Sequence, residues 1–512
     1  MRLTCLIITF LGWLNLGFSQ VGVQSLNTYY KDRYFHTTHM QGYQGDGLFP
    51  VSTATYDIKQ KVADTSKHYY WITEKLFASP IVNFKGKNFH IKATPVFDAA
   101  IGKNLTGEEA TLYQNTRGFH FEIDLLKNVS VSTSFYENQS RHTDYETNYF
   151  RSNGERYFHP NGYIVDNAVI PGMARTKPFK ENGFDYGFAF GEVNYKPHKS
   201  LLFALGNGQR FIGDGYRSIL QSDNSVVAPF IQVSYEVNPR LKIHHYRSKL
   251  TNLLRRPNYS AVEALYETKL SAVNYVSFQA TKSWNIGLFE GTIYGRGDSL
   301  QQERVNPLYY NPIPVLSALI VDEKEANSII GLQSSYHFDK AHVYGQFAFN
   351  PKSKGMGGQL GVRYYPLTGK HFLQLQLEGN LTGDLYASSA PRLNYSQYNL
   401  PLGHIKGDNI SELVFRASYE FKRIYGELKE IFYHYKSYNP NAHLPLYQVG
   451  SAQNGHQIHS SIEVGYRFNP SINFTAFVSY AMNAVRLENY SYTSNTLQIG
   501  IRTGLINSYR DF

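Results

Sequence analysis

Apolar and polar residues alternate at every second position along many segments of the chain. In residues 461–468, for example, Ile462, Val464, Tyr466 and Phe468 alternate with serine, glutamate, glycine and arginine. Successive side chains of a β-strand point to opposite faces, so this pattern predicts strands with one apolar and one polar face. The same alternation occurs at 89–97, 119–125, 129–135, 184–190, 231–237, 373–377, 413–421, 472–482 and 497–501.

The number and length of these segments favour a barrel. We count about fourteen regular strands, and about four less regular ones near 201–206, 273–282, 286–294 and 424–434. Several have about ten residues, the length that a tilted strand needs to cross a membrane. We therefore predict an all-β fold, a transmembrane outer-membrane β-barrel of about 18 antiparallel strands with apolar faces toward lipid. A soluble β-sandwich or β-helix is the alternative, because it shows the same alternation.

Composition supports this prediction and excludes two other classes. The chain has 42 Tyr and 33 Phe, and its 15% aromatic content excludes intrinsic disorder. Aromatic residues are also typical of the interfacial girdles of membrane barrels. Lysine and arginine exceed aspartate and glutamate by 50 to 40, but they are scattered along the chain. Without a dense basic block, a nucleic-acid partner is not expected.

The first residues have the features of an export signal. Arg2 precedes an apolar run from Leu3 to Phe18, and a small residue, Ser19, precedes the predicted cleavage site. We therefore predict a signal peptide at 1–19; an N-terminal membrane anchor is the alternative. The single cysteine, Cys5, falls within this peptide, so the exported chain is expected to have no disulfide and no thiol chemistry.

The remainder divides into an arm and a barrel. Residues 20–80 are predicted to form an N-terminal arm with short helices, because Tyr56–Phe77 has apolar residues at roughly helical spacing. Residues 81–512 are predicted to form the barrel. Its polar, turn-rich segments near 136–182, 383–412 and 437–458 are expected to be long loops on the extracellular side.

Catalytic and metal-binding signatures are missing from the sequence. It contains no HExxH, GxSxG or P-loop motif and no strand-associated GxGxxG. His244 and His245 are adjacent on a predicted strand and therefore point to opposite faces, which argues against shared ligation. His456 and His459 are more simply explained as solvated histidines. We expect no catalytic residue, no metal and no cofactor, and therefore no enzyme.

Two unusual segments supply the candidate site residues. In residues 206–224, glycine turns surround Arg210, Asp214 and Arg217. Tight turns at glycine would bring these three side chains together as a latch inside the lumen, and we expect Asp214 to pair with one of the arginines. The same arginines could instead bind sugar hydroxyls or carboxylates.

The second segment, residues 394–412, is a polar loop that contains Tyr395, Tyr398 and His404. Aromatic faces beside asparagine and glutamine amides suit carbohydrate binding, although they also suit an ordinary barrel rim. These three residues complete the set of candidate polysaccharide-binding residues.

Together, several motifs resemble the Wzi-like capsule-assembly family of outer-membrane proteins, and most of all its RemB-type gliding-motility branch. They are GNGQRFIGDGYRSILQSDN (206–224), WNIGLFEGTIYGR (284–296), NPLYYNP (306–312), YGQFAFN (344–350), QLGVRYY (359–365), NYSQYNLPLGH (394–404) and GDNISEL (407–413). The resemblance extends over residues 80–512. One departure is that His404–Ile410 reads HIKGDNI where many relatives have HPLGANF.

The resemblance implies a barrel of about eighteen strands with a small helical element at the periplasmic side. It also implies a role in holding capsular polysaccharide at the surface of a Gram-negative cell, or in surface gliding. We therefore expect an outer-membrane barrel that contacts lipid, binds or organises cell-surface polysaccharide and acts with other motility or capsule proteins. The alternative is a porin-like channel for small solutes.

Overall fold

The computed structural model describes residues 27–41, 45–51, 70–106, 111–126, 128–158, 161–255, 266–296, 304–439, 444, 452–488 and 490–512. The predicted signal peptide, residues 52–69 of the predicted arm and half of the predicted 437–458 loop lie outside these residues. Within that loop, 437–438 and 453–458 belong to strands, contrary to the prediction. In the described part of the chain, no helix is both long and apolar enough to span a membrane.

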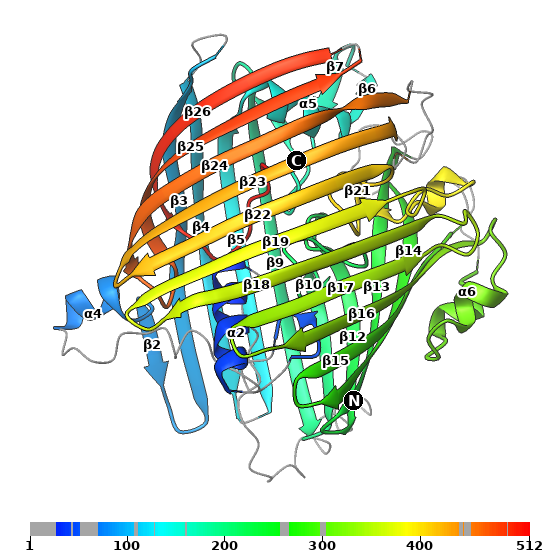
Figure 1. Cartoon of the computed structure of the whole chain (residues 1–512), viewed down its shortest axis with the longest axis horizontal. Coiled ribbons are helices and arrows are strands. Elements are labelled where there is room, and N and C mark those ends of the chain that lie inside the picture. Colours follow the sequence, from blue (N-terminus) through cyan, green and yellow to red (C-terminus); the bar gives the residue numbers. More distant parts are fainter. Residues whose placement is uncertain are drawn as a thin grey trace.

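Eighteen antiparallel strands form a closed barrel (Figure 1). In chain order they are β3 (Phe89–Asn104), β4 (Thr111–Leu125), β5 (Val129–Arg141), β9 (Gly183–His198), β10 (Leu201–Gly208), β12 (Ala228–Asn238), β13 (Leu241–Arg255), β14 (Tyr266–Thr281), β15 (Trp284–Tyr294), β16 (Ala326–His337), β17 (Ala341–Phe349), β18 (Met356–Thr368), β19 (His371–Thr382), β22 (Ile410–Phe421), β23 (Ile424–Tyr438), β24 (Gln453–Asn469), β25 (Phe474–Leu487) and β26 (Tyr490–Thr503). Each pairs with the next, and β26 pairs with β3 to close the wall. The predicted fold class is confirmed, and the four less regular segments are all strands.

Two short strands extend the wall at its edges. The closing ladder between β26 and β3 uses only the second half of β3, from Asp98 to Asn104. β2 (Val82–Lys85) pairs with the first half of β3, from His90 to Ala93, and so continues the sheet beyond the end of β26. β8 (Lys177–Phe179) pairs with the beginning of β9 in the same way.

The two faces of the wall follow the alternation in the sequence. On β19, Leu377 and Leu381 point outward and are 47% and 58% exposed, whereas Gln376 and Glu378, on either side of Leu377, point inward and are almost fully buried. Gln376 donates a hydrogen bond to Tyr344 and accepts one from Arg416. The polar face is therefore buried against other protein groups, not against an open water-filled lumen.

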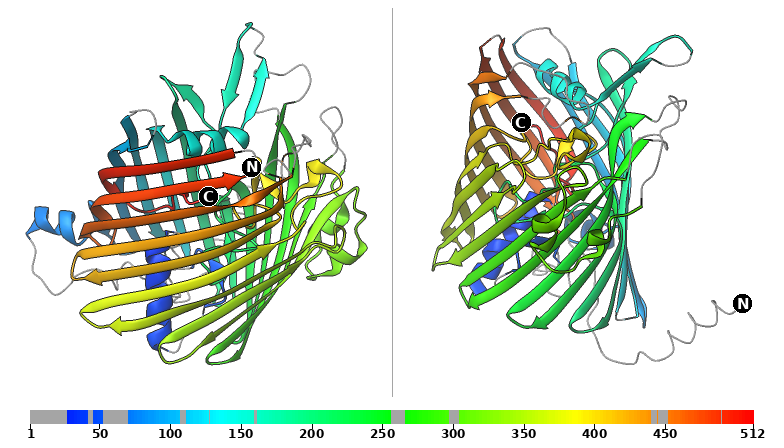
Figure 2. Two further views of the ribbon diagram at one scale, coloured as in Figure 1. Left: turned by 45° about the horizontal axis from the view of Figure 1, so that its top comes forward. Right: turned by 90° about the vertical axis from the view of Figure 1, so that its right-hand side faces the viewer.

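Short turns lie at one end of the barrel and long connections at the other, which we name the short-turn end and the long-loop end. The long connections carry the small elements α5 (Asp144–Ser152), β6 (Glu155–Phe158), β7 (Ile164–Asn167), η2 (Pro307–Tyr310), α6 (Leu316–Ile320), η3 (Pro391–Leu393), β20 (Ser396–Gln397) and β21 (Leu400–Pro401). Residues 136–141, which were expected to belong to a loop, are the last part of β5. In Figure 2, α5 and the β6–β7 hairpin stand at the long-loop end.

Residues 27–41 and 45–51 of the N-terminal arm lie in the lumen. α2 (Thr28–Gln41) lies between the near and far walls, and its Tyr30 and Tyr34 are almost fully buried (Figures 1 and 2). Asp32 of α2 pairs with Arg416 of β22 at 2.9 Å. β1 (Leu48–Phe49) then pairs with β11 (Phe211–Ile212), which belongs to the connection between β10 and β12.

α4 (Trp71–Phe77) lies outside the barrel wall at the short-turn end (Figure 1). The carbonyl oxygen of Phe77 accepts a hydrogen bond from Arg423, and those of Lys75 and Ser79 accept from Asn469. α4 is therefore fixed to the turns that follow β22 and β24.

Leu377→Arg should lower the free energy of unfolding by roughly 2–4 kcal/mol, because the new charge would face the hydrocarbon near mid-depth. Equilibrium urea unfolding in lipid vesicles measures the effect. Thr368→Arg is the matched control, since Thr368 is exposed beside the turn between β18 and β19 and an arginine there remains in water. An equal loss of stability in both variants would contradict the outward orientation of Leu377.

Candidate ligand cavity in the barrel lumen

Four parts of the chain lie in the lumen: residues 28–41 with 45–51, residues 209–227, residues 383–409 and residues 504–512. Several of their side chains are inaccessible to solvent, as at Leu220, Leu385 and Phe512. The segments also bind one another, since the Tyr386 hydroxyl donates a 2.9 Å hydrogen bond to the carbonyl oxygen of Ile219. A barrel of eighteen strands is wide enough for an aqueous channel, and here protein takes up that space.

Arg217 of the 209–227 segment contacts two strands of the wall and the 504–512 segment. Its guanidinium donates to Glu412 of β22 at 3.1 Å, to the Tyr433 hydroxyl of β23 at 3.0 Å and to the carbonyl oxygen of Asp511 at 2.9 Å. The backbone NH of Arg217 donates to Glu378 of β19. Arg217 therefore ties the 209–227 segment to the wall and to the 504–512 segment.

The 504–512 segment turns back into the barrel after β26. Lys429 lies 2.7 Å from the carboxylate of Asp511, and burial alone would raise the pKa of Asp511. Arg217 and Lys429 outweigh that effect and hold its pKa well below the ordinary value. The carbonyl oxygen of Phe512 accepts hydrogen bonds from Tyr145 and Gln457, both at 2.7 Å.

Arg210 makes a separate set of contacts on the β9–β12 side of the lumen. It pairs with Glu192 of β9 at 2.9 Å and donates to Gln232 of β12 at 2.6 Å. Its guanidinium also stacks over the ring of Phe230 at 4.2 Å. Arg210 thus fixes the beginning of the 209–227 segment to the wall, whereas Arg217 fixes its middle.

Asp214 does not pair with either arginine, so the predicted three-residue latch is wrong. Its carboxylate lies 3.3 Å from Nε2 of His342 on β17. The preceding Gly213 has φ +138°, and a side chain there would collide with the Gln346 amide, so the chain turns sharply at this point. That turn directs Asp214 to β17 and away from the partners of Arg210 and Arg217.

The three residues of the 394–412 loop are also inside the barrel. Tyr395 is fully buried and its hydroxyl donates to Gln221 of the 209–227 segment at 3.0 Å. The backbone NH of Tyr398 donates to Thr251 of β13 at 3.1 Å. His404 is fully buried, 2.8 Å from Glu412, so His404 and Arg217 share one carboxylate. His404 and Tyr395 also share Tyr386, whose hydroxyl accepts from the backbone NH of His404 and whose carbonyl oxygen accepts from the backbone NH of Tyr395.

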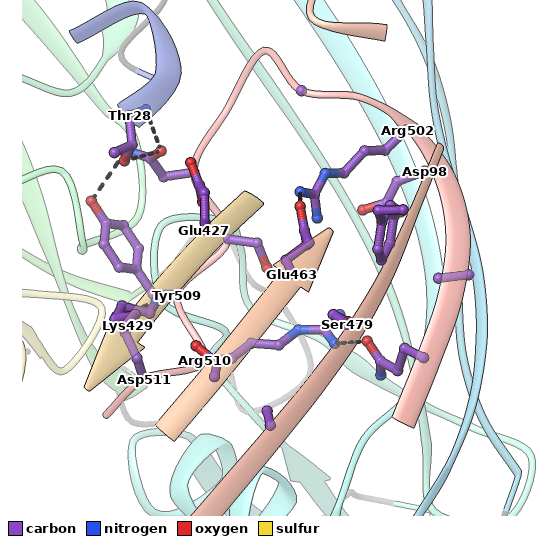
Figure 3. Close-up of a pocket in the computed structure, with 18 of the residues that line it drawn as sticks. Thr28, Asp98, Glu427, Lys429, Glu463, Ser479, Arg502, Tyr509, Arg510 and Asp511 are labelled. Atoms are coloured by element: carbon purple, nitrogen blue, oxygen red, sulfur yellow. Dashed lines mark hydrogen bonds and ion pairs between the residues drawn. The ribbon is translucent and has the colours of Figure 1, made fainter. Parts of the chain in front are cut away.

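A polar cavity of about 310 Å³ remains between the 504–512 segment, the beginning of α2 and the strands β22 to β26, β3 and β4 (Figure 3). Its volume lies at the lower limit of the roughly 300–1,000 Å³ that is usual for small-molecule sites. The charged residues along it are Asp98, Glu146, Arg416, Glu427, Lys429, Glu463, Arg467, Arg502, Arg510 and Asp511. Five are acidic and five are basic, so the two signs are equal in number.

Some of these charged groups are paired with protein groups and others are not. Arg502 and Glu463 point toward each other as an ion pair, and Arg510 reaches across the cavity to Gln498 at 3.2 Å (Figure 3). No hydrogen bond or ion pair joins Glu427 to another described residue, and Oδ1 of Asp98 is buried without a partner among them. Two carboxylates are thus available to accept hydrogen bonds from a ligand.

The chemistry of the cavity is that of a site for hydroxyl-rich molecules. Serine, threonine, asparagine and glutamine side chains line it beside the aromatic rings of Tyr425 and Phe477. Carboxylates accept hydrogen bonds from hydroxyl groups, guanidinium groups donate to oxygen atoms, and apolar rings cover CH faces. In the described part of the chain, no cluster of three or more histidine, aspartate or glutamate side chains could hold a metal ion.

None of the six candidate residues lines this cavity. The cavity residues were nevertheless partly visible in the sequence, because Glu463, Arg467 and Arg502 occupy polar positions of alternating strands. The alternation places them on the lumen face, but only the closure of β26 onto β3 brings Arg502 close to Asp98. The role of the six residues in ligand binding stays a prediction.

Comparison with known structures gives one match above a TM-score of 0.5 among those described below. The chain is similar to Wzi of Escherichia coli, described as an outer-membrane protein involved in group 1 capsule assembly and a carbohydrate-binding β-barrel, with a TM-score of 0.56 and 12% identity, covering 95% of this chain and 100% of Wzi. Two other matches are OpdK of Pseudomonas aeruginosa (TM-score 0.41, 12% identity, 81% of this chain and 98% of OpdK) and OccAB4 of Acinetobacter baumannii (TM-score 0.44, 8% identity, 82% and 98%). No protein-family model and no curated protein matches the sequence. At 12% identity, the similarity to Wzi establishes the β-barrel fold.

Proposed function

We propose that this protein is an outer-membrane barrel that binds a cell-surface polysaccharide and that the luminal cavity takes one or a few of its sugar units. The observation that carries the proposal is a polar luminal cavity with two carboxylates, Glu427 and Asp98, that have no hydrogen bond or ion pair with another described residue. The fold similarity to Wzi over 95% of the chain supports it, because that protein is described as carbohydrate-binding.

A porin-like channel is less consistent with these contacts. A diffusion channel needs a continuous aqueous path, and barrels of about 16–18 strands provide one when their lumen is empty. Here the 209–227 segment crosses the lumen, because its Arg210 pairs with Glu192 of β9 and its Arg217 pairs with Glu412 of β22 on the opposite side of the barrel. We therefore favour binding over permeation.

We further propose that the polysaccharide is a capsular or exopolysaccharide and that the protein acts with other surface proteins in capsule assembly or gliding. The support is the resemblance of the motifs in residues 206–224 and 394–413 to Wzi-like and RemB-type proteins. A strain lacking the protein should lose surface-attached polysaccharide or gliding. If the strain keeps both its surface-attached polysaccharide and its gliding, this assignment is contradicted, whereas the proposal that the barrel binds polysaccharide is not affected.

Glu427→Gln should weaken polysaccharide binding by about tenfold, because a hydrogen bond to a charged acceptor contributes roughly 1.5–3 kcal/mol. The probe is polysaccharide purified from the surface of the producing bacterium, titrated calorimetrically against the purified barrel in detergent. Glu181→Gln is the control, since Glu181 lies exposed between β8 and β9. Equal affinity of the two variants would place the binding site elsewhere.

A further inference from the structure

The outer wall of the barrel carries a cluster of polar side chains on β13, β14 and β15. Arg247, Asn274 and Glu290 point outward, because their neighbours Tyr246, Val273 and Phe289 belong to the luminal core. Arg247 donates to the Asn274 side-chain oxygen at 2.9 Å, and the Asn274 amide donates to Glu290 at 3.0 Å. Asn274 and Glu290 are each only 1% exposed, although they lie on the outside of the wall.

This cluster lies at the level of the apolar belt. Arg247 is six residues from Leu241, where β13 begins, and Glu290 is six residues from the partly exposed Trp284, where β15 begins. At ~3.3 Å per residue and a tilt of ~40°, six residues rise roughly 15 Å, which is inside an apolar band about 25 Å high. Ile231, the cross-strand neighbour of Arg247, is 57% exposed.

Residues 304–321, which we name the flap, cover the cluster. Arg247 donates to the carbonyl oxygens of Tyr309 and Asn311 at 2.8 and 2.7 Å. The backbone NH of Ala318 donates to Glu290 at 2.9 Å. In Figures 1 and 2, the α6 part of the flap lies against the outside of the wall. The polar atoms of the wall are thus satisfied by the flap backbone.

The surface that the flap presents outward is apolar. Tyr310, Ile313, Leu319 and Ile320 are 58% to 68% exposed. Residues 305–321 contain no charged side chain, whereas Arg304 precedes them and Asp322 and Glu323 follow. Exposed apolar side chains together with an absence of charge are not typical of a loop in water. They are expected of a segment in contact with hydrocarbon, where a charged side chain is costly.

We propose that the flap is embedded in the bilayer, with its outer side chains in contact with lipid acyl chains, so that it replaces the lipid-facing surface of the wall over β13–β15. The proposal rests on the outer-membrane location proposed above. Its apolar surface continues the exposed apolar belt of the neighbouring strands, at Ile231 on β12 and Leu332 on β16. Charged groups that would be costly in hydrocarbon are thereby kept in hydrogen-bonded contact beneath it.

Tryptophan quenching in reconstituted barrels tests this placement. Trp71→Phe and Trp284→Phe leave residues 20–512 without tryptophan, and Leu319→Trp then places one probe on the flap. Leu377→Trp, on the belt of β19, is the lipid-exposed control. Ile164→Trp, 56% exposed on β7 at the long-loop end, is the water-exposed control. The quenchers are phospholipids with brominated acyl chains and aqueous iodide.

The proposal requires the Leu319→Trp probe to be quenched by brominated chains as strongly as the Leu377→Trp probe and to be insensitive to iodide. Quenching by iodide, as expected for the Ile164→Trp probe, would place the flap in water and overturn it. Protection from both quenchers would indicate a covering protein, such as a second copy, and would also overturn it. If brominated lipid does not quench the Leu377→Trp probe either, the membrane location itself is wrong.

Discussion

Replacing Arg217 by methionine should lower the free energy of unfolding by about 3 kcal/mol, the lower end of the range of roughly 3–5 kcal/mol for breaking a buried ion pair. Arg217 is buried and compensates two buried carboxylates, Glu412 and Asp511. Both keep a second partner, since His404 lies beside Glu412 and Lys429 beside Asp511. Because these second partners still compensate the two carboxylates, we expect a loss of unfolding free energy at the lower end of the range.

Urea unfolding of the reconstituted barrel measures the loss. Arg151→Met is the matched control, because Arg151 and Asp166 form a half-exposed pair 4.0 Å apart. A pair of that kind contributes at most about 1 kcal/mol. A loss for Arg217→Met no larger than for the control would contradict the role of Arg217 as the central connection of the lumen.

Removing residues 508–512 should convert the barrel from closed to conducting. The deletion eliminates Asp511 and Phe512, and with them the contacts to Arg217, Lys429 and Gln457. It also enlarges the polar cavity, which Tyr509, Arg510 and Asp511 line from one side. Planar-bilayer recordings should show stable ion currents for the deletion and little current for the intact protein.

Lys429→Met tests the same contact with a single substitution in place of a deletion. It removes one partner of Asp511 while the 504–512 segment remains present. We expect occasional openings instead of a permanent current, because Arg217 still holds the backbone of Asp511. A large steady current through the intact protein would contradict the closed lumen and would favour a porin.

The barrel could be predicted from the sequence because the alternation that produces it can be read within each strand. Along β19 or β24, every second residue meets lipid, so the alternation reports the fold directly. The less regular 273–282 and 286–294 segments follow it less closely, because Val273 and Phe289 are apolar in the luminal core. On their outer face, Asn274 and Glu290 are charged or amide side chains in an otherwise mainly apolar row. Those two exceptions mark the place where the flap, not lipid, covers the wall.

The interior of the barrel could not be predicted in the same way. The sequence indicates that 206–224 is an unusual segment, and both arginines there form buried ion pairs. Their partners are Glu192, Glu412 and Asp511, of which two lie about 200 residues or more from Arg217 in the chain. Such contacts depend on how each segment turns inside the barrel, as the pairing of Asp214 with His342 illustrates. No local pattern contains that information.

A structure of the barrel with a bound oligosaccharide tests the central claim most directly. The ligand would be a fragment released from the producing cell's own surface polysaccharide and soaked into crystals of the intact protein. The account predicts density for at least one sugar unit in the luminal cavity, within hydrogen-bond distance of Glu427 or Asp98 and beside Arg510. Density confined to the outside of the long loops, with the cavity unchanged, would contradict it.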